Sequence, residues 1–591
     1  MGISTRPFNQ LLEHALAGKL QLPEFQRNYV WTRKQAIELF DSLRLRYPIG
    51  SFLLMERNPE VPITPRPFAG STAARVTPDA FVLDGQQRIT AGLALRYGTS
   101  GSQYFVDLER LAELGQEADL DLKSPTEIAD FMATLDPEDG YMKGKRAGPD
   151  PAASITKGLL FTGVLSERAK LRTLRQAYVE QRPERALLWD GIVEDHLANG
   201  FELHVPVIEV EHDRPVQAIS RIFTTLNTTG QPLNAFELVV AVLYPSGIRL
   251  QSDVTESKEL FDGYYPRMDK IGEIFLQTIA LLANKTPKKS LLPKTIKPEI
   301  YSRYRNEAPD LLEKAGAFLT NRLGLGLDHS SDIVPYDSIF APFALALKHL
   351  EGMGLKGADR AEADRKLDKW FIISALDNRY QEGVHNKQER DRADVEAWLQ
   401  VPGDARAPLW IKDFKVPSLR SASPNGAVGR LLGCLINRQH PEDPVTGSVV
   451  GVSPSAVSTE RHHIFPKRWV AQYLDDWESG RTCDIALNVT FVSQDTNRRW
   501  ANVDPANQLT EIRAARHSGQ DVRASLGRHL IDDDCIAAMA KPNKRAEDFD
   551  AFIQARERAF LRVLKDGWGI LPQTGSSPAD LIEPEDESPA S

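Results

Sequence analysis

Residues 461–466 read Arg-His-His-Ile-Phe-Pro, and this stretch decides what is expected of the C-terminal part of the chain. A histidine pair before an apolar-proline turn puts two imidazoles at the end of a short strand. One ring can then serve as a general base, while its neighbour points the other way toward a cation. Asn488 follows His463 by 488 − 463 = 25 residues, and Asn497 follows Asn488 by 497 − 488 = 9, at the start of an expected helix.

This pattern resembles the HNH (ββα-metal) nuclease finger, for which the 25-then-9 spacing is typical. The resemblance implies that His463 activates the water that attacks phosphorus and that His462 and Asn497 hold one divalent cation. It also implies that Asn488 orients or hydrogen-bonds the base. Neutral imidazole accepts a proton near pH 7. Mg²⁺ or Mn²⁺ with open coordination positions would polarise the scissile phosphate.

The sequence departs from the HNH pattern at one position. The residue before the base is commonly acidic in that superfamily, and here it is His462. A nitrogen ligand favours Mn²⁺, Ni²⁺ or Zn²⁺ more than a carboxylate would. Either Glu460 or Asp495 could supply the missing negative charge, and the sequence leaves this open. The alternative interpretation makes the histidines packing or capping residues and the asparagines turn formers.

A second motif lies in the N-terminal part, where residues 83–88 read Leu-Asp-Gly-Gln-Gln-Arg between an expected strand and a helix. Gly85 allows a tight turn that exposes backbone N–H groups. Arg88 and Arg27 offer planar forks suited to phosphate oxygens. Asp84 could hold Mg²⁺, and Gln86 or Gln87 could orient a water toward a terminal phosphate. The chain has no GxxxxGK[ST] sequence, so a P-loop enzyme is excluded.

Together with residues 22–31 and 223–230, this DGQQR motif resembles the N-terminal domain of GmrSD-type restriction proteins. That domain is similar in fold to ParB/sulfiredoxin-like nucleotide-binding domains, and its partner in the family is the HNH domain. The resemblance implies that GTP or ATP is bound or hydrolysed. The alternative is a polar structural knot, in which Arg88 is buried against Asp84 and joins strand to helix.

The fold class expected is α+β multidomain, with a ParB/sulfiredoxin-like N-terminal domain, a mostly helical middle and a C-terminal ββα-metal (HNH) domain. The expected boundaries are 1–250 for the DGQQR domain, 251–413 for the helical middle, 427–570 for the nuclease domain and 571–591 for a disordered acidic tail. Residues 414–426 look like a linker. Apolar spacing predicts a helix over 32–45 with Thr32 as its N-cap, and short strands at 51–55, 81–83 and 203–210.

Composition fits an ordinary globular protein: 591 residues, 41% hydrophobic and 26% charged, with a net charge of 72 − 81 = −9. This balance excludes a wholly basic nucleic-acid coat and leaves room for local clusters such as the lysines of residues 285–297. Three scattered cysteines exclude a disulfide scaffold and fit a reducing compartment. No signal peptide or membrane span is expected, which predicts a cytoplasmic protein without a membrane partner.

The expected function is modification-dependent (type IV-like) DNA restriction against phage, with modified DNA and a nucleoside triphosphate as partners. Relatives of the BrxU kind act on hydroxymethylated or glucosylated cytosine, and SspE-like relatives sense phosphorothioate DNA. Two other classes stay open: a nucleotide-hydrolysing regulator whose finger only binds DNA, and an RNA-targeting toxin. The sequence does not fix the modification, the choice of GTP or ATP, nicking or double-strand cutting, or whether the chain forms a homo-oligomer.

Overall fold

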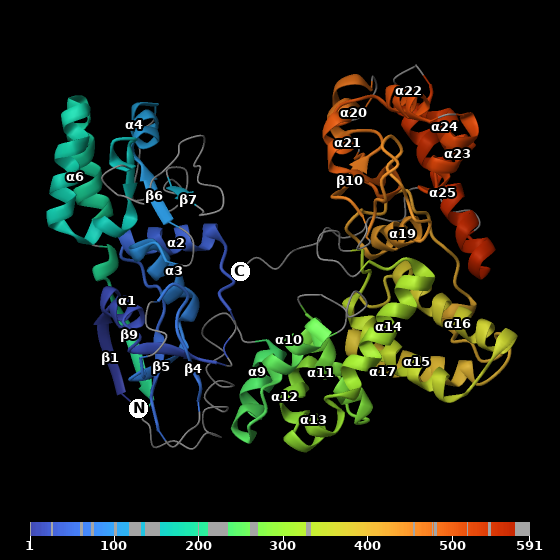
Figure 1. Ribbon diagram of the computed structural model, residues 1–591, viewed down its shortest axis with the longest axis horizontal. Helices are drawn as coiled ribbons and strands as arrows, with labels where there is room; N and C mark the ends of the chain where they lie inside the picture. Colours follow the sequence, from blue (N-terminus) through green and yellow to red (C-terminus); the bar gives the residue numbers. More distant parts are fainter. Residues whose placement is uncertain are drawn as a thin grey trace. The chain divides into compact units, whose positions relative to one another are not determined.

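The computed structural model divides the chain into two compact units, residues 1–247 and 248–591 (Figure 1). It describes all residues except 1, 25, 27, 60–62, 72–75, 100–102, 118–131, 136–153, 199, 211–233, 261–269, 327–332, 453–455, 475–476, 478–481, 517, 542–544 and 574–591. Arg27, the 223–230 segment and most of the expected acidic tail therefore lie outside the described residues.

A six-stranded mixed sheet forms the centre of the first unit. Its strand order is β1-β9-β3-β5-β2-β4, in which β9–β3 and β5–β2 are parallel and the other neighbours antiparallel. The strands are β1 Gly2–Pro7, β2 Leu20–Pro23, β3 Phe52–Glu56, β4 Pro65–Arg66, β5 Ala80–Asp84 and β9 His204–Val210. A second, antiparallel sheet has the order β7-β6-β8, with β6 Gln103–Asp107, β7 Met132–Leu135 and β8 Leu159–Phe161.

Helices complete the core of the first unit. They are α1 Phe8–Leu16, α2 Arg33–Arg44, α3 Gln86–Tyr97, α4 Leu108–Glu117, α6 Arg168–Gln181, α7 Ala186–Leu188 and α9 Ala235–Leu243. The predicted N-cap of α2 is confirmed: Thr32 accepts a hydrogen bond from the backbone of Gln35, whose side chain accepts one from the Thr32 backbone N–H. Helices α1 and α3 approach closely because Gly92 has no side chain, and an added Cβ would lie 2.8 Å from Phe8 and Leu12.

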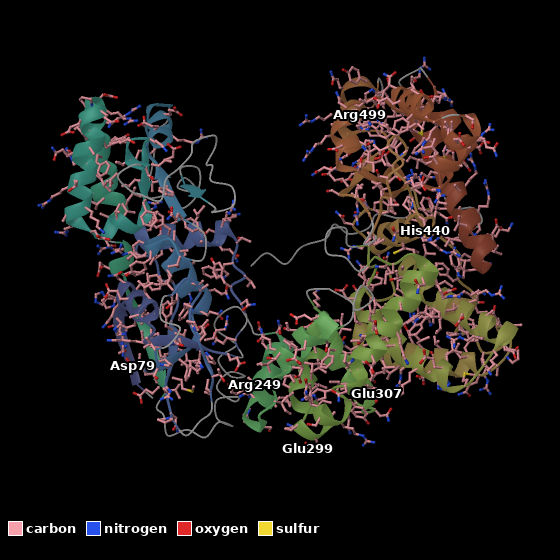
Figure 2. The ribbon with its side chains drawn as sticks, viewed as in Figure 1. Asp79, Arg249, Glu299, Glu307, His440 and Arg499 are labelled. Atoms are coloured by element: carbon pink, nitrogen blue, oxygen red, sulfur yellow. The ribbon has the colours of Figure 1, made fainter. Side chains whose placement is uncertain are left out.

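The second unit is mostly helical, with one two-stranded antiparallel sheet among the described residues. Its helices are α10 Leu250–Leu260, α11 Ile271–Leu282, α12 Leu292–Thr295, α13 Pro298–Tyr304, α14 Glu307–Leu323, α15 Phe340–Gly352, α16 Gly357–Leu376, α17 Val384–Leu399, α18 Leu409–Lys412, α19 Ala427–Asn437, α20 Lys467–Tyr473, α21 Gln494–Arg499, α22 Pro505–Ala515, α23 Gly519–Gly527, α24 Asp533–Met539 and α25 Ala546–Trp568. Its strands are β10 Thr459–His463 and β11 Val489–Ser493. In Figure 2, Glu299 and Glu307 lie in the green helical part and Arg499 in the orange C-terminal part.

Residues 414–426 contain no helix or strand, but they do not form a free linker. Val416 and Leu419 are buried, and Glu557 of α25 accepts hydrogen bonds from Ser418, from the Leu419 backbone and from Arg420. Apolar side chains within the segment give it a surface to bury, so it packs against α25.

The α+β class expected from the sequence is confirmed, with a mixed sheet in the N-terminal region. The ParB/sulfiredoxin-like likeness stays a prediction. Among the described residues, no helix has the length and apolar character needed to cross a membrane.

Candidate functional site

The histidine pair lies on a strand that pairs with β11. In the antiparallel register, His462 faces Thr490 and His463 faces Val489. Ser493 ends β11 and caps α21 by accepting a hydrogen bond from Thr496 N at 3.2 Å. Two strands and a short helix thus bring together His462, from β10, and Asn497, from α21.

His462 and Asn497 are in direct contact. His462 Nδ1 lies 2.9 Å from Asn497 Oδ1, and Asn497 Nδ2 donates to the Glu460 carboxylate. That second hydrogen bond fixes the amide so that its oxygen faces the imidazole. His462 is 3% exposed, and burial lowers its pKa although its hydrogen bond to Asn497 opposes the shift. The ring is therefore held in the neutral form that can bind a metal.

As it stands, the contact is an Nδ1–H···Oδ1 hydrogen bond, and these two atoms could share a divalent cation only if the ion replaced that proton. Two neighbouring ligands of an octahedral ion with bonds of about 2.1 Å lie about 3 Å apart, close to the separation of His462 Nδ1 and Asn497 Oδ1. No group of three or more histidine, cysteine or acidic side chains able to hold a metal occurs among the described residues. Of the two carboxylates that the sequence left open, Glu460 reaches this pair through Asn497.

His463 is held by a residue that the sequence analysis missed. Its Nε2 lies 2.8 Å from Asp484 Oδ1, and Lys467 Nζ donates to Asp484 Oδ2 at 2.7 Å. Burial would raise the pKa of Asp484, but the contacts with Lys467 and His463 outweigh it and lower the pKa. Asp484 is thus a carboxylate at neutral pH. The available sequence signal was an acid four residues before Asn488.

Asn488 is fully buried and bonds backbone rather than an imidazole. Its Oδ1 accepts from Phe465 N at 2.9 Å, and its Nδ2 donates to Phe465 O at 3.0 Å and Cys483 O at 2.9 Å. Those two backbone positions adjoin the His463–Asp484 contact, because Phe465 follows His463 by two residues and Cys483 precedes Asp484. Asn488 can therefore position His463 against Asp484 through the backbone.

A second residue missed by the sequence analysis supports Asn497. Asp443 is completely buried, and it accepts hydrogen bonds from Ser493 N at 2.8 Å and from Thr496 Oγ1 at 3.1 Å. Asp443 Oδ1, which accepts from Thr496, also accepts a hydrogen bond from Thr446 N at 2.9 Å. Burial raises the pKa of Asp443, but the hydrogen bonds from Thr446, Ser493 and Thr496 outweigh it and lower the pKa. The carboxylate therefore fixes the first turn of α21.

In the DGQQR motif, Gly85 is left-handed with φ 96°, and an added Cβ would lie 2.3 Å from Phe52. Arg88 is mostly buried over the Phe52 ring; it donates to Ile49 O at 2.6 Å and to Asp84 at 3.0 Å. Burial lowers the pKa of Arg88, although Asp84 opposes the shift. These contacts match the structural-knot alternative for Arg88. The Asp84 carboxylate itself is about half-exposed.

Both glutamines of the motif are buried. Gln87 Oε1 accepts from Val30 N at 2.9 Å and Trp31 N at 3.3 Å, while its Nε2 donates to Asn28 O at 3.1 Å. Gln87 thereby ties the 28–31 segment to α3. The structure brings Asp84, Gly85 and Arg88 together around the start of α3, whereas Arg27 lies outside the described residues.

Comparison with known proteins identifies the first unit. Residues 8–244 match the family model described as "GmrSD restriction endonuclease, N-terminal domain", so the first unit is similar to a domain of restriction endonucleases. This match confirms, for the first unit, the predicted resemblance to the GmrSD-type restriction family. The matched range lies within the first unit and does not cover the histidine pair.

A relative is similar over nearly the whole chain. The uncharacterized protein MJ0686 of Methanocaldococcus jannaschii is 25% identical over 616 aligned positions, which cover 95% of this chain and 98% of the relative. The likeness therefore spans both units. The name of that relative states no activity.

Proposed function

We propose that the second unit is a metal-dependent HNH-type nuclease and that the whole chain restricts modified phage DNA. The observation that carries the proposal is the contact of His462 Nδ1 with Asn497 Oδ1 at 2.9 Å, beside His463 on the same strand. Membership of the first unit in a restriction endonuclease family supports DNA as the substrate.

In the proposed mechanism, His463 is the general base. When its Nε2–H is donated to Asp484, Nδ1 carries the lone pair and takes the proton of the attacking water. Asp484 holds the ring and stabilises the imidazolium that forms. His462 and Asn497 would hold the divalent cation, which supplies charge stabilisation at the scissile phosphate when bound. Asn488 keeps the backbone on both sides of the His463–Asp484 contact in place.

The test compares wild-type protein with His463→Ala on plain, hydroxymethylcytosine, glucosylated and phosphorothioate duplexes in Mn²⁺ or Mg²⁺. Loss of a general base lowers the rate by about 10²- to 10⁴-fold, so the variant is expected to cut at least about 100-fold more slowly. His349→Ala, which removes an imidazole on α15, is the matched control and should cut normally. Equal cutting by His463→Ala would refute the assignment, and the preferred duplex separates BrxU-like from SspE-like recognition.

We also propose that the DGQQR region binds GTP or ATP and that nucleotide turnover depends on Asp84. This follows from the family, and the half-exposed carboxylate at the entrance to α3 supports it. Asp84→Asn is expected to lower steady-state hydrolysis of GTP or ATP by at least about tenfold, because a neutral amide binds Mg²⁺ poorly. Asp79→Asn, an exposed acid just before β5, is the control. Unchanged turnover in Asp84→Asn would leave the motif a purely structural knot.

A further inference from the structure

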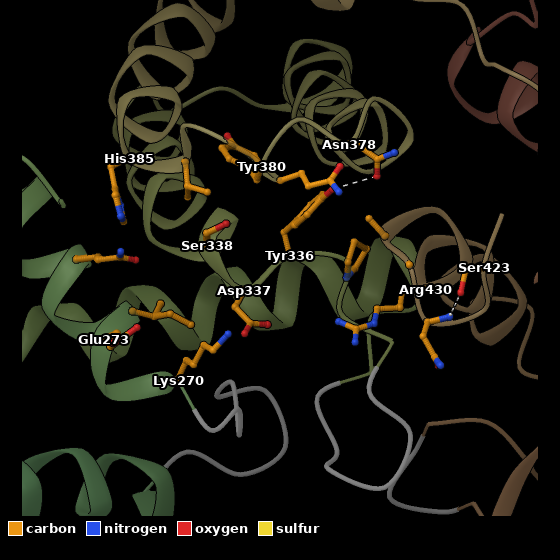
Figure 3. A pocket seen from close by; sticks show the side chains of 18 of the residues that line it. Lys270, Glu273, Tyr336, Asp337, Ser338, Asn378, Tyr380, His385, Ser423 and Arg430 are labelled. Atoms are coloured by element: carbon orange, nitrogen blue, oxygen red, sulfur yellow. Dashed lines mark hydrogen bonds between the residues drawn. The ribbon is translucent and has the colours of Figure 1, made fainter. Parts of the chain in front are cut away.

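A large cavity in the second unit adjoins the proposed nuclease centre. It has a volume of about 1010 Å³ and is lined by the start of α11, by residues 335–338 and 378–385, by residues 421–430 and by Thr482 and Asp484 (Figure 3). This volume is at the upper end of the range for pockets that bury a small organic ligand. No role has been assigned to it so far.

Asp484 connects the cavity to the reacting atoms. It lines the cavity, and its Oδ1 lies 2.8 Å from His463 Nε2. A ligand in the cavity can therefore touch the carboxylate that holds the general base. A group attached to such a ligand could reach the phosphodiester on which His463 acts.

The lining offers both hydrogen-bonding amides and aromatic rings. Tyr336 donates to Asn378 Oδ1 at 3.1 Å, an interaction drawn in Figure 3, and Gln381 adds a second amide. The Tyr336 and Tyr380 rings pack edge to face with centroids 6.0 Å apart. Amide groups that donate and accept, placed beside aromatic rings, suit the edge and face of a nucleobase.

The charges of the lining limit what phosphate group it can take. Among the described lining residues, three cations (Lys270, Lys289 and Arg430) stand against three carboxylates (Glu273, Asp337 and Asp484). Lys289 is paired with Glu273 at 2.5 Å. Lys270 makes no ion pair with any described residue and is exposed. With three cations against three carboxylates, the lining offers no net positive charge to a triphosphate, whereas one backbone phosphate per nucleotide suits Lys270, which makes no ion pair with any described residue.

We propose that this cavity receives one unstacked nucleotide of the DNA strand, next to the phosphodiester that His463 attacks. The proposal rests on the proposed nuclease function. Its recognition elements are the amides of Asn378 and Gln381 for the base edge, the partly exposed ring of Tyr336 for the base face and Lys270 for the flanking phosphate. Unstacking a base costs least where that base is mispaired, damaged or already single-stranded, so such a cavity would favour these sites over plain duplex.

The test uses full-length protein carrying His463→Ala, which is expected to bind without cutting, and the four duplexes named above with 2-aminopurine scanned through the sequence. Binding is expected to raise 2-aminopurine fluorescence several-fold at one position. Gln381→Trp, which fills the cavity from an exposed position, should abolish that rise. Lys270→Ala should lower the slope of log affinity against log salt by about 1, as loss of one phosphate contact does. Lys356→Ala, an exposed lysine outside the lining, is the control and should change neither signal.

The proposal is overturned if fluorescence rises at no position, or if the rise persists in Gln381→Trp while circular dichroism shows that variant folded. It is also overturned if free ATP or GTP competes for the cavity while DNA does not. Failure of the nuclease function is a separate result. In that case wild-type protein cuts none of the duplexes, and the fluorescence rise alone still decides whether the cavity takes a nucleotide.

Discussion

The fully buried carboxylate of Asp443 shows how one residue supports the proposed centre from outside it. It accepts from Ser493 N and Thr496 Oγ1, at the start of the helix that carries Asn497. Its pKa is lowered because these hydrogen bonds stabilise the charged form more than burial destabilises it. If an amide NH₂ replaced one carboxylate oxygen of Asp443, this donor would face the buried Ser493 N–H or Thr496 hydroxyl, which is also a donor.

We expect Asp443→Asn to destabilise the second unit by about 2–4 kcal/mol, since a buried charged acceptor is lost and its donors are left unsatisfied. Cleavage should fall further than stability explains, because Asn497 moves with α21. Urea unfolding and single-turnover cleavage measure the two effects. Asp504→Asn, an exchange at the N-cap of α22 where asparagine caps as well as aspartate, should leave both nearly unchanged. An Asp443→Asn protein as stable and active as wild type would remove this positioning role.

Sequence could name the residues of the finger that stand at a fixed spacing, and the structure brings His462 and Asn497 into contact. It could not name Asp443 or Asp484. Each lies in a loop, and its partners are brought to it by the fold: Ser493 lies 50 residues from Asp443, and His463 lies 21 from Asp484. Nor could sequence show that the side chains of Arg88 and Gln87 form hydrogen bonds with backbone groups.

At the scale of elements, the start of α3 depends on a backbone conformation that only glycine adopts easily. Gly85 has φ 96°, and Phe52 of β3 fills the space where a side chain would begin. We expect Gly85→Ala to destabilise the first unit by roughly 2–4 kcal/mol, from strain plus the clash with Phe52. Thermal unfolding measures it. Gly191→Ala, at a helical position with open space around it, should be neutral or slightly stabilising. Equal melting temperatures for both variants would contradict the account.

Local signals predicted several elements well. The helix expected over 32–45 is α2, capped by Thr32, and the strands expected at 51–55, 81–83 and 203–210 are β3, β5 and β9. Capping chemistry and apolar periodicity act within a few residues, so a sequence displays them directly. The strand order β1-β9-β3-β5-β2-β4 was beyond prediction because it joins strands up to two hundred residues apart.

At the scale of the molecule, the helical middle and the finger region fold as one compact unit, residues 248–591. Trp568 of α25 donates to Asp368 of α16 at 3.1 Å, and Arg322 forms a two-point ion pair with the same carboxylate. Residues 414–426, expected as a linker, pack against α25. Composition alone marks Pro, Ser and Gly as linker-like, whereas burial of Val416 and Leu419 depends on partners far along the chain.

The family match covers the first unit, so the function of the second depends on its own geometry. The central claim is that His462 Nδ1 and Asn497 Oδ1 share one divalent cation beside His463. Electron spin-echo envelope modulation of the full-length protein with one equivalent of Mn²⁺ detects an imidazole nitrogen bonded to the ion. We predict nitrogen modulation in wild type and in His463→Ala, and its loss in His462→Ala. Nitrogen modulation that survives in His462→Ala, or a protein that binds no Mn²⁺, would contradict the claim.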